Sequence, residues 1–167
     1  MANNKTTKVE PQTVSAIPEN VDQNMYITVY NGFHGILVYE SKKTGETFIW
    51  NDFGESQEME LKELRNAKST HKSFFVNNYF MFDDESKWVI DYLGVASFYE
   101  HAIELDGFNE IFTSSPAQIK KIIGNMSEGQ KKSLLYSAKK KVADGEVDSL
   151  KIIKALEEGL GAELIEH

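Results

Sequence analysis

The chain has 167 residues and a mass of 19.0 kDa, which is near the usual size of one globular domain and excludes a large multidomain enzyme. Its 18 Lys and Arg against 26 Asp and Glu give a net charge of −8, which opposes general attraction to nucleic acid or anionic lipid. The absence of cysteine removes disulfides, thiol nucleophiles and iron–sulfur clusters. Apolar runs are too short to span a bilayer, so we expect a soluble, unsecreted protein without membrane contacts.

Residues 1–24 are polar and hold two of the three prolines, Pro11 and Pro18. Such a segment buries too little apolar surface to offset its chain entropy, so we expect a flexible N-terminal arm. Two interpretations stay open. The arm is a tail without a role, or it becomes ordered against a neighbouring subunit.

Residues 25–62 predict a small antiparallel β-meander. The runs MYITVY, ILVYE and TFIW, with a weaker EMELK, are separated by glycine-containing turns. Met25, Ile27 and Val29 alternate with polar or amphipathic residues, as expected for a strand with one buried face. A sheet of this size must be covered by the following helices or by another chain.

Residues 63–167 predict a helical region packed on the sheet, so that 25–167 form one compact domain. The aromatic block at 74–82 is expected in the core. Asp84 is expected to cap a helix that Gly94 ends, and short helices are expected at about 95–103 and 107–114.

The last 50 residues carry the clearest helix signals. Ser115 with Gln118, and Ser127 with Gln130, have the spacing of capping boxes. Asp148 is expected to cap the final helix, and the last two helices are expected to form an αα-hairpin. The sequence therefore predicts an α+β fold, with a small antiparallel β-meander followed by a bundle of short helices that ends in an αα-hairpin.

Charge is segmented along the chain. Residues 116–141 contain seven lysines and one glutamate, and they lie between two acidic segments, 81–115 and 142–167. These lysines are either the solvated backs of amphipathic helices or a docking face. As a docking face, they would suit the acidic 81–115 surface of another subunit better than nucleic acid, because Arg65 is the only arginine in the chain.

No local motif indicates catalysis. In GNMSEGQKKS, Gln130 replaces the lysine that a phosphate-binding loop requires. The four histidines are far apart and lack metal-ligand spacing; even His101, with acidic neighbours, fits a solvated or capping role better than a metal site. We therefore predict a protein that is not an enzyme, with no catalytic residue, cofactor or metal.

The predicted interaction residues are aromatic and basic. Tyrosine and tryptophan are enriched at interfaces, and several aromatic residues lie in or beside the small sheet. The candidates are Tyr26, Tyr39, Trp50, Lys131, Lys132, Lys139, Lys140 and Lys141.

Residues 25–166 resemble small virion-associated structural proteins of tailed bacteriophages. The resemblance is carried by TGE, W and FG between residues 44 and 54, by SFFVNNYF, and by SEGQKKS at 127–133. It implies a structural role and contributes no catalytic residue.

Together these observations predict a non-enzymatic structural or assembly component of a bacteriophage particle, associated with the capsid, neck or tail. Its partners are expected to be other virion proteins and further copies of itself, in the virion and, during assembly, in the host cytoplasm. The alternative is a phage-encoded regulatory protein that binds a host protein or nucleic acid through the lysine-rich helices.

Overall fold

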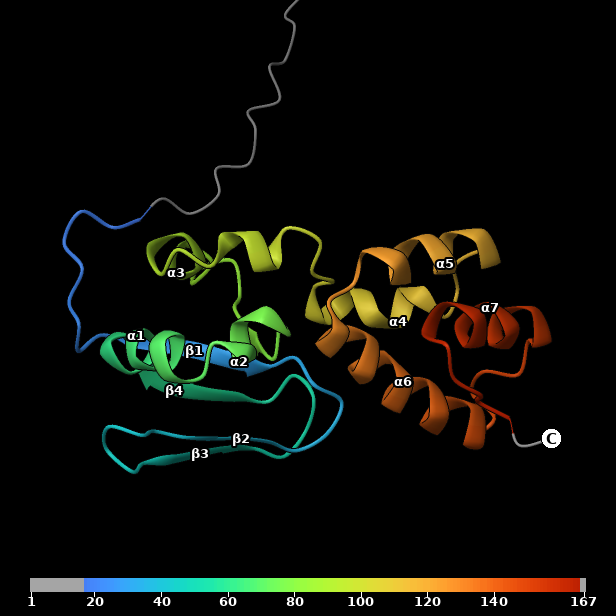
Figure 1. Cartoon of the computed structure of the whole chain (residues 1–167), viewed down its shortest axis with the longest axis horizontal. Coiled ribbons are helices and arrows are strands. Elements are labelled where there is room, and N and C mark those ends of the chain that lie inside the picture. Colours follow the sequence, from blue (N-terminus) through green and yellow to red (C-terminus); the bar gives the residue numbers. More distant parts are fainter. Residues whose placement is uncertain (1–16, 166–167) are drawn as a thin grey trace, which may run out of the picture.

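Strands occupy the first part of the chain and helices the rest in the computed structural model, which describes residues 17–165 (Figure 1). The strands are β1 (Tyr26–Asn31), β2 (Leu37–Glu40), β3 (Thr47–Trp50), β4 (Ser56–Glu60) and β5 (Phe80–Met81). The α-helices are α1 (Leu61–Thr70), α2 (Ser73–Val76), α3 (Trp88–Tyr92), α4 (Phe108–Ile111), α5 (Pro116–Asn125), α6 (Glu128–Ala143) and α7 (Leu150–Leu160). Short 3₁₀ turns, η1 (Ala96–Tyr99) and η2 (Leu105–Gly107), precede α4. This confirms the predicted α+β class.

The strand order differs from that of a simple meander. β1 lies between β4 and β5, with Ile27 opposite Met59, while β2 and β3 form a separate antiparallel hairpin. The alternating pattern gives each strand a buried face, but it does not specify which strand is the neighbour. The chain therefore returns to β1 only after completing the hairpin.

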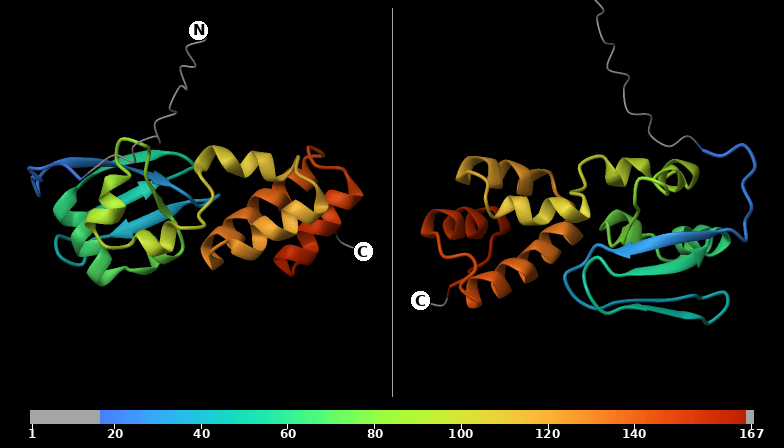
Figure 2. Two further views of the ribbon diagram at one scale, coloured as in Figure 1. Left: turned by 90° about the horizontal axis from the view of Figure 1, so that it is seen from above. Right: turned by 180° about the vertical axis from the view of Figure 1, so that it is seen from behind.

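Two hydrophobic clusters divide the described residues. The first lies between Ile27 and Val95 and joins the strands to α1, α2 and α3. The second lies between Phe108 and Leu156 and is formed by α4 to α7. Figure 2 shows these two parts at opposite ends of the molecule. The C-terminal helices thus build a core of their own, whereas the sequence analysis placed the whole helical region on the sheet.

Some helix starts agree with the capping residues predicted from the sequence, and others do not. Ser115 and Ser127 accept hydrogen bonds from the backbone N–H groups of Gln118 and Gln130, as predicted. The prediction for Asp84 is wrong, because α3 begins only at Trp88 and Asp83 accepts the Ser86 N–H instead.

The remaining helix-end signals are the predicted cap at Asp148 and the glycines at 94 and 161. The prediction for Asp148 is also wrong, since Ser149 is the N-cap of α7 and no side chain caps it. Gly94 and Gly161 adopt positive φ angles, 71° and 65°, which glycine accommodates without strain.

The last helix packs mainly on α5. Gly159 of α7 approaches Ile123 of α5 so closely that a Cβ atom at 159 would lie 2.8 Å from Ile123 Cδ1. The predicted C-terminal helix pair is therefore present, and the six residues between α6 and α7 carry α7 across to α5, on which it mainly packs.

Residues 1–16 of the predicted arm lie outside the described residues. The remainder contacts the first core: Val21 packs against it, and the Lys62 N–H donates to the Gln23 carbonyl (2.9 Å). The segment from Val21 to Asn24 is therefore part of the folded unit, in contrast to the expected arm boundary. No helix within residues 17–165 is both long and apolar enough to cross a membrane.

Candidate functional site

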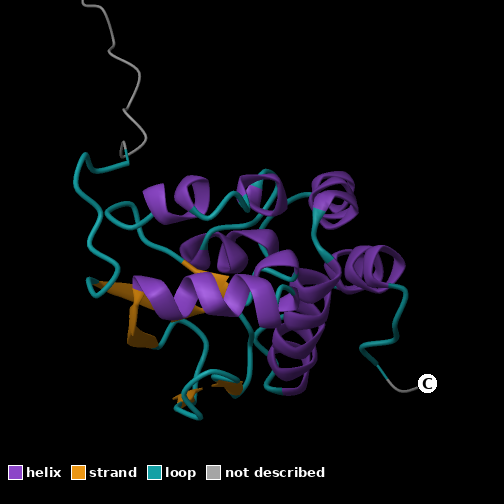
Figure 3. Ribbon diagram, turned by 60° about the vertical axis from the view of Figure 1, so that its left-hand side comes forward, coloured by secondary structure: helices purple, strands orange, loops and turns teal. Residues whose placement is uncertain are grey.

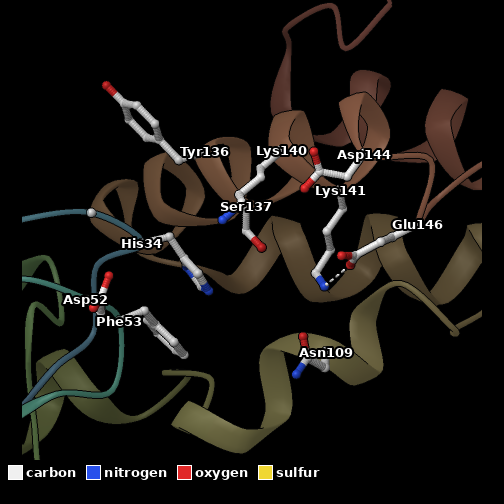
Figure 4. A pocket seen from close by; sticks show the side chains of 11 residues that line it. His34, Asp52, Phe53, Asn109, Tyr136, Ser137, Lys140, Lys141, Asp144 and Glu146 are labelled. Carbon is white, nitrogen blue, oxygen red and sulfur yellow. Dashed lines mark hydrogen bonds and ion pairs between the residues drawn. The ribbon is translucent and has the colours of Figure 1, made fainter.

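A pocket of about 390 Å³ lies where the two parts of the molecule meet (Figure 4). One side is formed by loops that follow β1 and β3, and the other by α4, α6 and the start of the α6–α7 connection. Its lining residues are His34, Gly35, Asp52, Phe53, Asn109, Tyr136, Ser137, Lys140, Lys141, Asp144 and Glu146.

Asn31 organises the loops on the sheet side of this pocket. Its side chain is fully buried, and its Nδ2 donates to the carbonyls of Gly35 (2.8 Å) and Asp52 (3.1 Å). Its Oδ1 accepts from the Phe33 N–H (2.9 Å). One buried amide therefore fixes the loop after β1 and the loop after β3 relative to each other.

His34 connects these loops to the C-terminal helices. Its ring stacks on Phe53, with centroids 3.8 Å apart and planes 9° apart, and meets Phe108 of α4 edge-on. The His34 N–H donates to Ser133 Oγ of α6 (2.9 Å), and His34 Nδ1 lies 2.6 Å from the same oxygen. The imidazole is thus held by contacts from three segments.

The environment of His34 keeps the imidazole neutral. Burial lowers the pKa of His34 from 6.5 to about 4, and the nearby Lys141 ammonium acts in the same direction. At neutral pH this imidazole is a weak base.

Ser133 acts as a structural link between the sheet part and α6. It is fully buried, and its hydroxyl also donates to the Gly32 carbonyl (3.2 Å). Its oxygen is therefore engaged by the loop after β1 and is not exposed to a substrate. The geometry assigns the His34–Ser133 pair a positioning role at the junction.

The far wall of the pocket is charged. Lys141 pairs with Glu146 (3.1 Å) and lies over the Phe112 ring, 5.4 Å from its centroid. Asp52, Asp144 and Lys140 are exposed at the rim. Within residues 17–165 no three His, Asp or Glu side chains are placed so that they could hold a metal ion together. That the chain is not an enzyme stays a prediction.

The aromatic interaction candidates have different positions. Tyr26 is 66% exposed, but Tyr39 and Trp50 are fully buried, which corrects their predicted place at an interface. The Tyr39 hydroxyl donates to Glu63 (2.6 Å), and Trp50 Nε1 donates to the Val29 carbonyl (2.9 Å). Their polar atoms are satisfied internally, so both rings belong to the first core.

Four of the five lysine candidates, all on α6, differ in whether they form an ion pair. Lys131 pairs with Glu128 (3.2 Å). Lys132, Lys139 and Lys140 are exposed and form no ion pair within the described part of the chain.

The fifth candidate, Lys141, belongs to the pocket described above. The predicted basic segment is therefore divided. Lys120, Lys131 and Lys141 pair with carboxylates. The other members are exposed and form no ion pair within residues 17–165: Lys121 of α5, and Lys132, Lys139 and Lys140 of α6.

The apolar outer face of the β2–β3 hairpin was not predicted from the sequence. Ile36, Val38 and Ile49 are 65%, 48% and 45% exposed, and Val38 lies directly opposite Ile49 in the ladder. The alternation in LVYE and TFIW indicates two faces for each strand, but both faces carry apolar residues. That pattern was the signal for a second apolar surface.

Comparison with known proteins gives no match: no family model, no curated protein and no solved structure is significantly similar to the chain. The resemblance to virion proteins consequently stays a prediction.

Proposed function

We propose that the protein is a structural or assembly component of a tailed-bacteriophage particle that acts by contacting other protein subunits. The observation that carries this proposal is the outer face of the β2–β3 hairpin, formed by Ile36, Val38 and Ile49. The hairpin lies at the lower margin of the molecule in Figure 3, and its inner face packs on the first core. Contiguous exposed apolar residues mark protein interaction surfaces more often than single ones do.

The strand pairing supports the same surface. Within residues 17–165, the β2–β3 hairpin forms a two-stranded sheet of its own. Its inner face belongs to the first core, so its outer face remains for contact with another chain.

We name a second copy of this chain as the partner. The exposed lysines of α6 and the acidic residues of segment 81–115 lie on one protomer, which gives two copies complementary charges.

The test is self-association of the purified full-length protein in sedimentation velocity. Wild type should form dimers or larger species as its concentration rises, and Val38→Lys with Ile49→Lys should shift it to monomer. Leu150→Lys is the matched control, because Leu150 is 73% exposed on a different element, α7. A wild type that stays monomeric, or a control that dissociates as readily, contradicts the proposed contact.

The particle role has its own measurement. Mass spectrometry of purified virions should detect the protein at a copy number that matches a symmetric ring or shell. Complete absence from mature particles contradicts the structural role, even if the protein self-associates.

The regulatory alternative is favoured by one observation, the exposed lysines of α6 without ion pairs. If these residues bind polynucleotide, the affinity should fall steeply as salt rises. Replacing Lys132, Lys139 and Lys140 by Gln should then abolish binding. The structural proposal expects no such binding in wild type.

A further inference from the structure

A second hollow, of about 640 Å³, lies at the opposite end of the molecule from the α6 lysines. It is lined by residues of α1, of the turn between β2 and β3, and of the end of α3. We call it the α1 basic pocket. Its lining residues are Lys43, Lys62, Arg65, Asn66, Lys68, Ser69, Tyr92 and Leu93.

The α1 basic pocket concentrates positive charge in an acidic protein. Four cationic side chains and no carboxylate line it, although the chain has a net charge of −8. Arg65, the only arginine of the chain, is among them. Like charges brought together repel each other, so such a group is unfavourable unless an anion compensates it.

Internal partners compensate little of this charge. Glu60 lies 3.0 Å from Lys62 Nζ. Lys43, Arg65 and Lys68 form no ion pair within residues 17–165. Three of the four cations therefore have donors free for an external anion.

Neutral amides hold two of the cations in place. Arg65 Nη1 donates to Gln23 Oε1 (2.9 Å), and Lys62 Nζ donates to Asn24 Oδ1 (2.8 Å). Gln23 in turn donates to the Tyr92 hydroxyl (2.8 Å). The amides orient the charged groups without neutralising them, and this lowers the entropic cost of binding a ligand.

Helix chemistry alone does not explain the cluster. Lys68 lies in the last turn of α1, where a cation interacts favourably with the helix dipole. Lys43, however, comes from the β2–β3 turn, and Lys62 lies in the first turn of α1, where the dipole disfavours a cation. Their convergence on one hollow requires a reason other than helix capping.

We infer that the α1 basic pocket binds a small molecule that carries two or more phosphate groups. The guanidinium of Arg65 can bind a phosphate through two parallel hydrogen bonds, and the lysines supply point charges. Ser69 and Asn66 also line the pocket, but they already donate to the Arg65 carbonyl and to Ser41 and Glu63, so the cations supply the free donors. The volume lies within the range of small-ligand sites.

A compact ligand fits better than a nucleic acid strand. The cations line one open hollow instead of following an extended track, and the rest of the chain is acidic, which opposes a long polyanion. Phosphate groups on a small molecule place their charge within the hollow and leave the acidic surface uncontacted.

The test is a titration of the full-length protein with inorganic pyrophosphate, followed by amide chemical shifts in NMR. Saturable shifts should centre on residues 62–69 with Lys43 and Leu93. The variant Arg65→Gln with Lys68→Gln should weaken binding by about tenfold or more, because each lost charge-assisted hydrogen bond contributes substantially. Lys132→Gln with Lys139→Gln, on α6, removes the same charge elsewhere and should leave the Kd within about twofold. All four positions are exposed, so these variants should retain the fold.

Three outcomes overturn the inference. The first is the absence of saturable, localised shifts up to about 10 mM pyrophosphate, a concentration at which even weak specific sites fill. The second is equal weakening in the α6 control, which indicates bulk electrostatics. The third is a single-stranded oligonucleotide or an acidic peptide that binds the same residues more tightly than pyrophosphate, which assigns the pocket to a macromolecule.

Discussion

His34 occupies the point at which three segments of the chain meet. Its ring lies between Phe53 and Phe108, and Ser133 holds its backbone and its Nδ1. The charged form of the ring would be buried beside the Lys141 ammonium, which is why the pKa of His34 falls to about 4. A residue without recognisable local context in the sequence therefore couples the two parts of the molecule.

We expect this contact to make stability depend on pH. The pKa of His34 is about 4 in the folded state and 6.5 in the absence of the fold, so the unfolded chain binds more protons between these values. The free energy of unfolding should therefore fall as the pH is lowered through this window. Urea denaturation at about pH 7 and about pH 5 should show a larger loss for wild type than for His34→Gln.

His101→Gln is the matched control for this experiment. His101 is exposed, so its replacement removes one histidine without touching the junction. Equal pH dependence in wild type and His34→Gln contradicts the assigned role of His34.

Gln130 shows which contacts a local sequence pattern can predict and which it cannot. Its backbone N–H donates to Ser127, as the capping pattern predicts. Its side chain, however, donates to the Ile103 carbonyl and accepts the Ile103 N–H, both at 2.9 Å. The pattern identified the start of α6, but the partner of the Gln130 side chain lies 27 residues away and depends on the tertiary fold.

At the scale of elements, the first turn of α6 is pressed against the residues that follow α2. A Cβ atom at Gly129 would overlap the side chain and carbonyl of Asn77 and would lie 2.7 Å from Asn77 Cα. Because the obstacle is backbone, it cannot move aside cheaply. Glycine at 129 is therefore required by a close approach of two elements.

The glycines of the C-terminal helices provide a matched pair of variants. Gly129→Ala should destabilise the protein by about 1–3 kcal/mol, because the added methyl group overpacks a buried contact. Gly124→Ala, in α5, meets nothing within 4 Å and should stabilise the protein by up to about 1 kcal/mol through helix propensity. Thermal and urea unfolding measure both. Stabilisation by Gly129→Ala contradicts the close approach.

The strands show the same difference between what a local pattern predicts and what tertiary packing decides. Alternation in residues 25–30, 36–40 and 47–50 indicated strands that the structure confirms at nearly the same bounds. The pairing of β1 with β4 depends on which buried faces fit together, here Ile27 and Val29 against Met59, and is not encoded by either strand alone.

At the scale of the whole molecule, residues 17–165 form two hydrophobic cores that meet at one junction. The first core is built on the sheet and the second on α4 to α7. The junction between them is held by hydrogen bonds of Ser133 to His34 and Gly32, and by the stacking of His34 on Phe53 beside Phe108. We expect the two parts to differ in local stability.

Two core substitutions test this expectation. Leu64→Ala in the first core and Leu156→Ala in the second remove fully buried side chains, and each should cost about 2–5 kcal/mol. Hydrogen exchange measured by mass spectrometry should increase mostly in β1 to α3 for Leu64→Ala and mostly in α4 to α7 for Leu156→Ala. A uniform increase along the chain in both variants indicates a single cooperative unit and contradicts the division.

The amino-acid sequence by itself determined the α+β class, strands β1 to β3, the starts of α5 and α6 and the left-handed ends after Tyr92 and Leu160, because each of these depends on residues within one or two turns of one another. Only the tertiary structure decided that Tyr39 and Trp50 are buried, that the chain has two cores, and that Lys43 joins α1 in one basic pocket. These features depend on contacts between residues far apart in the chain, where packing and charge, and not local pattern, select the neighbours.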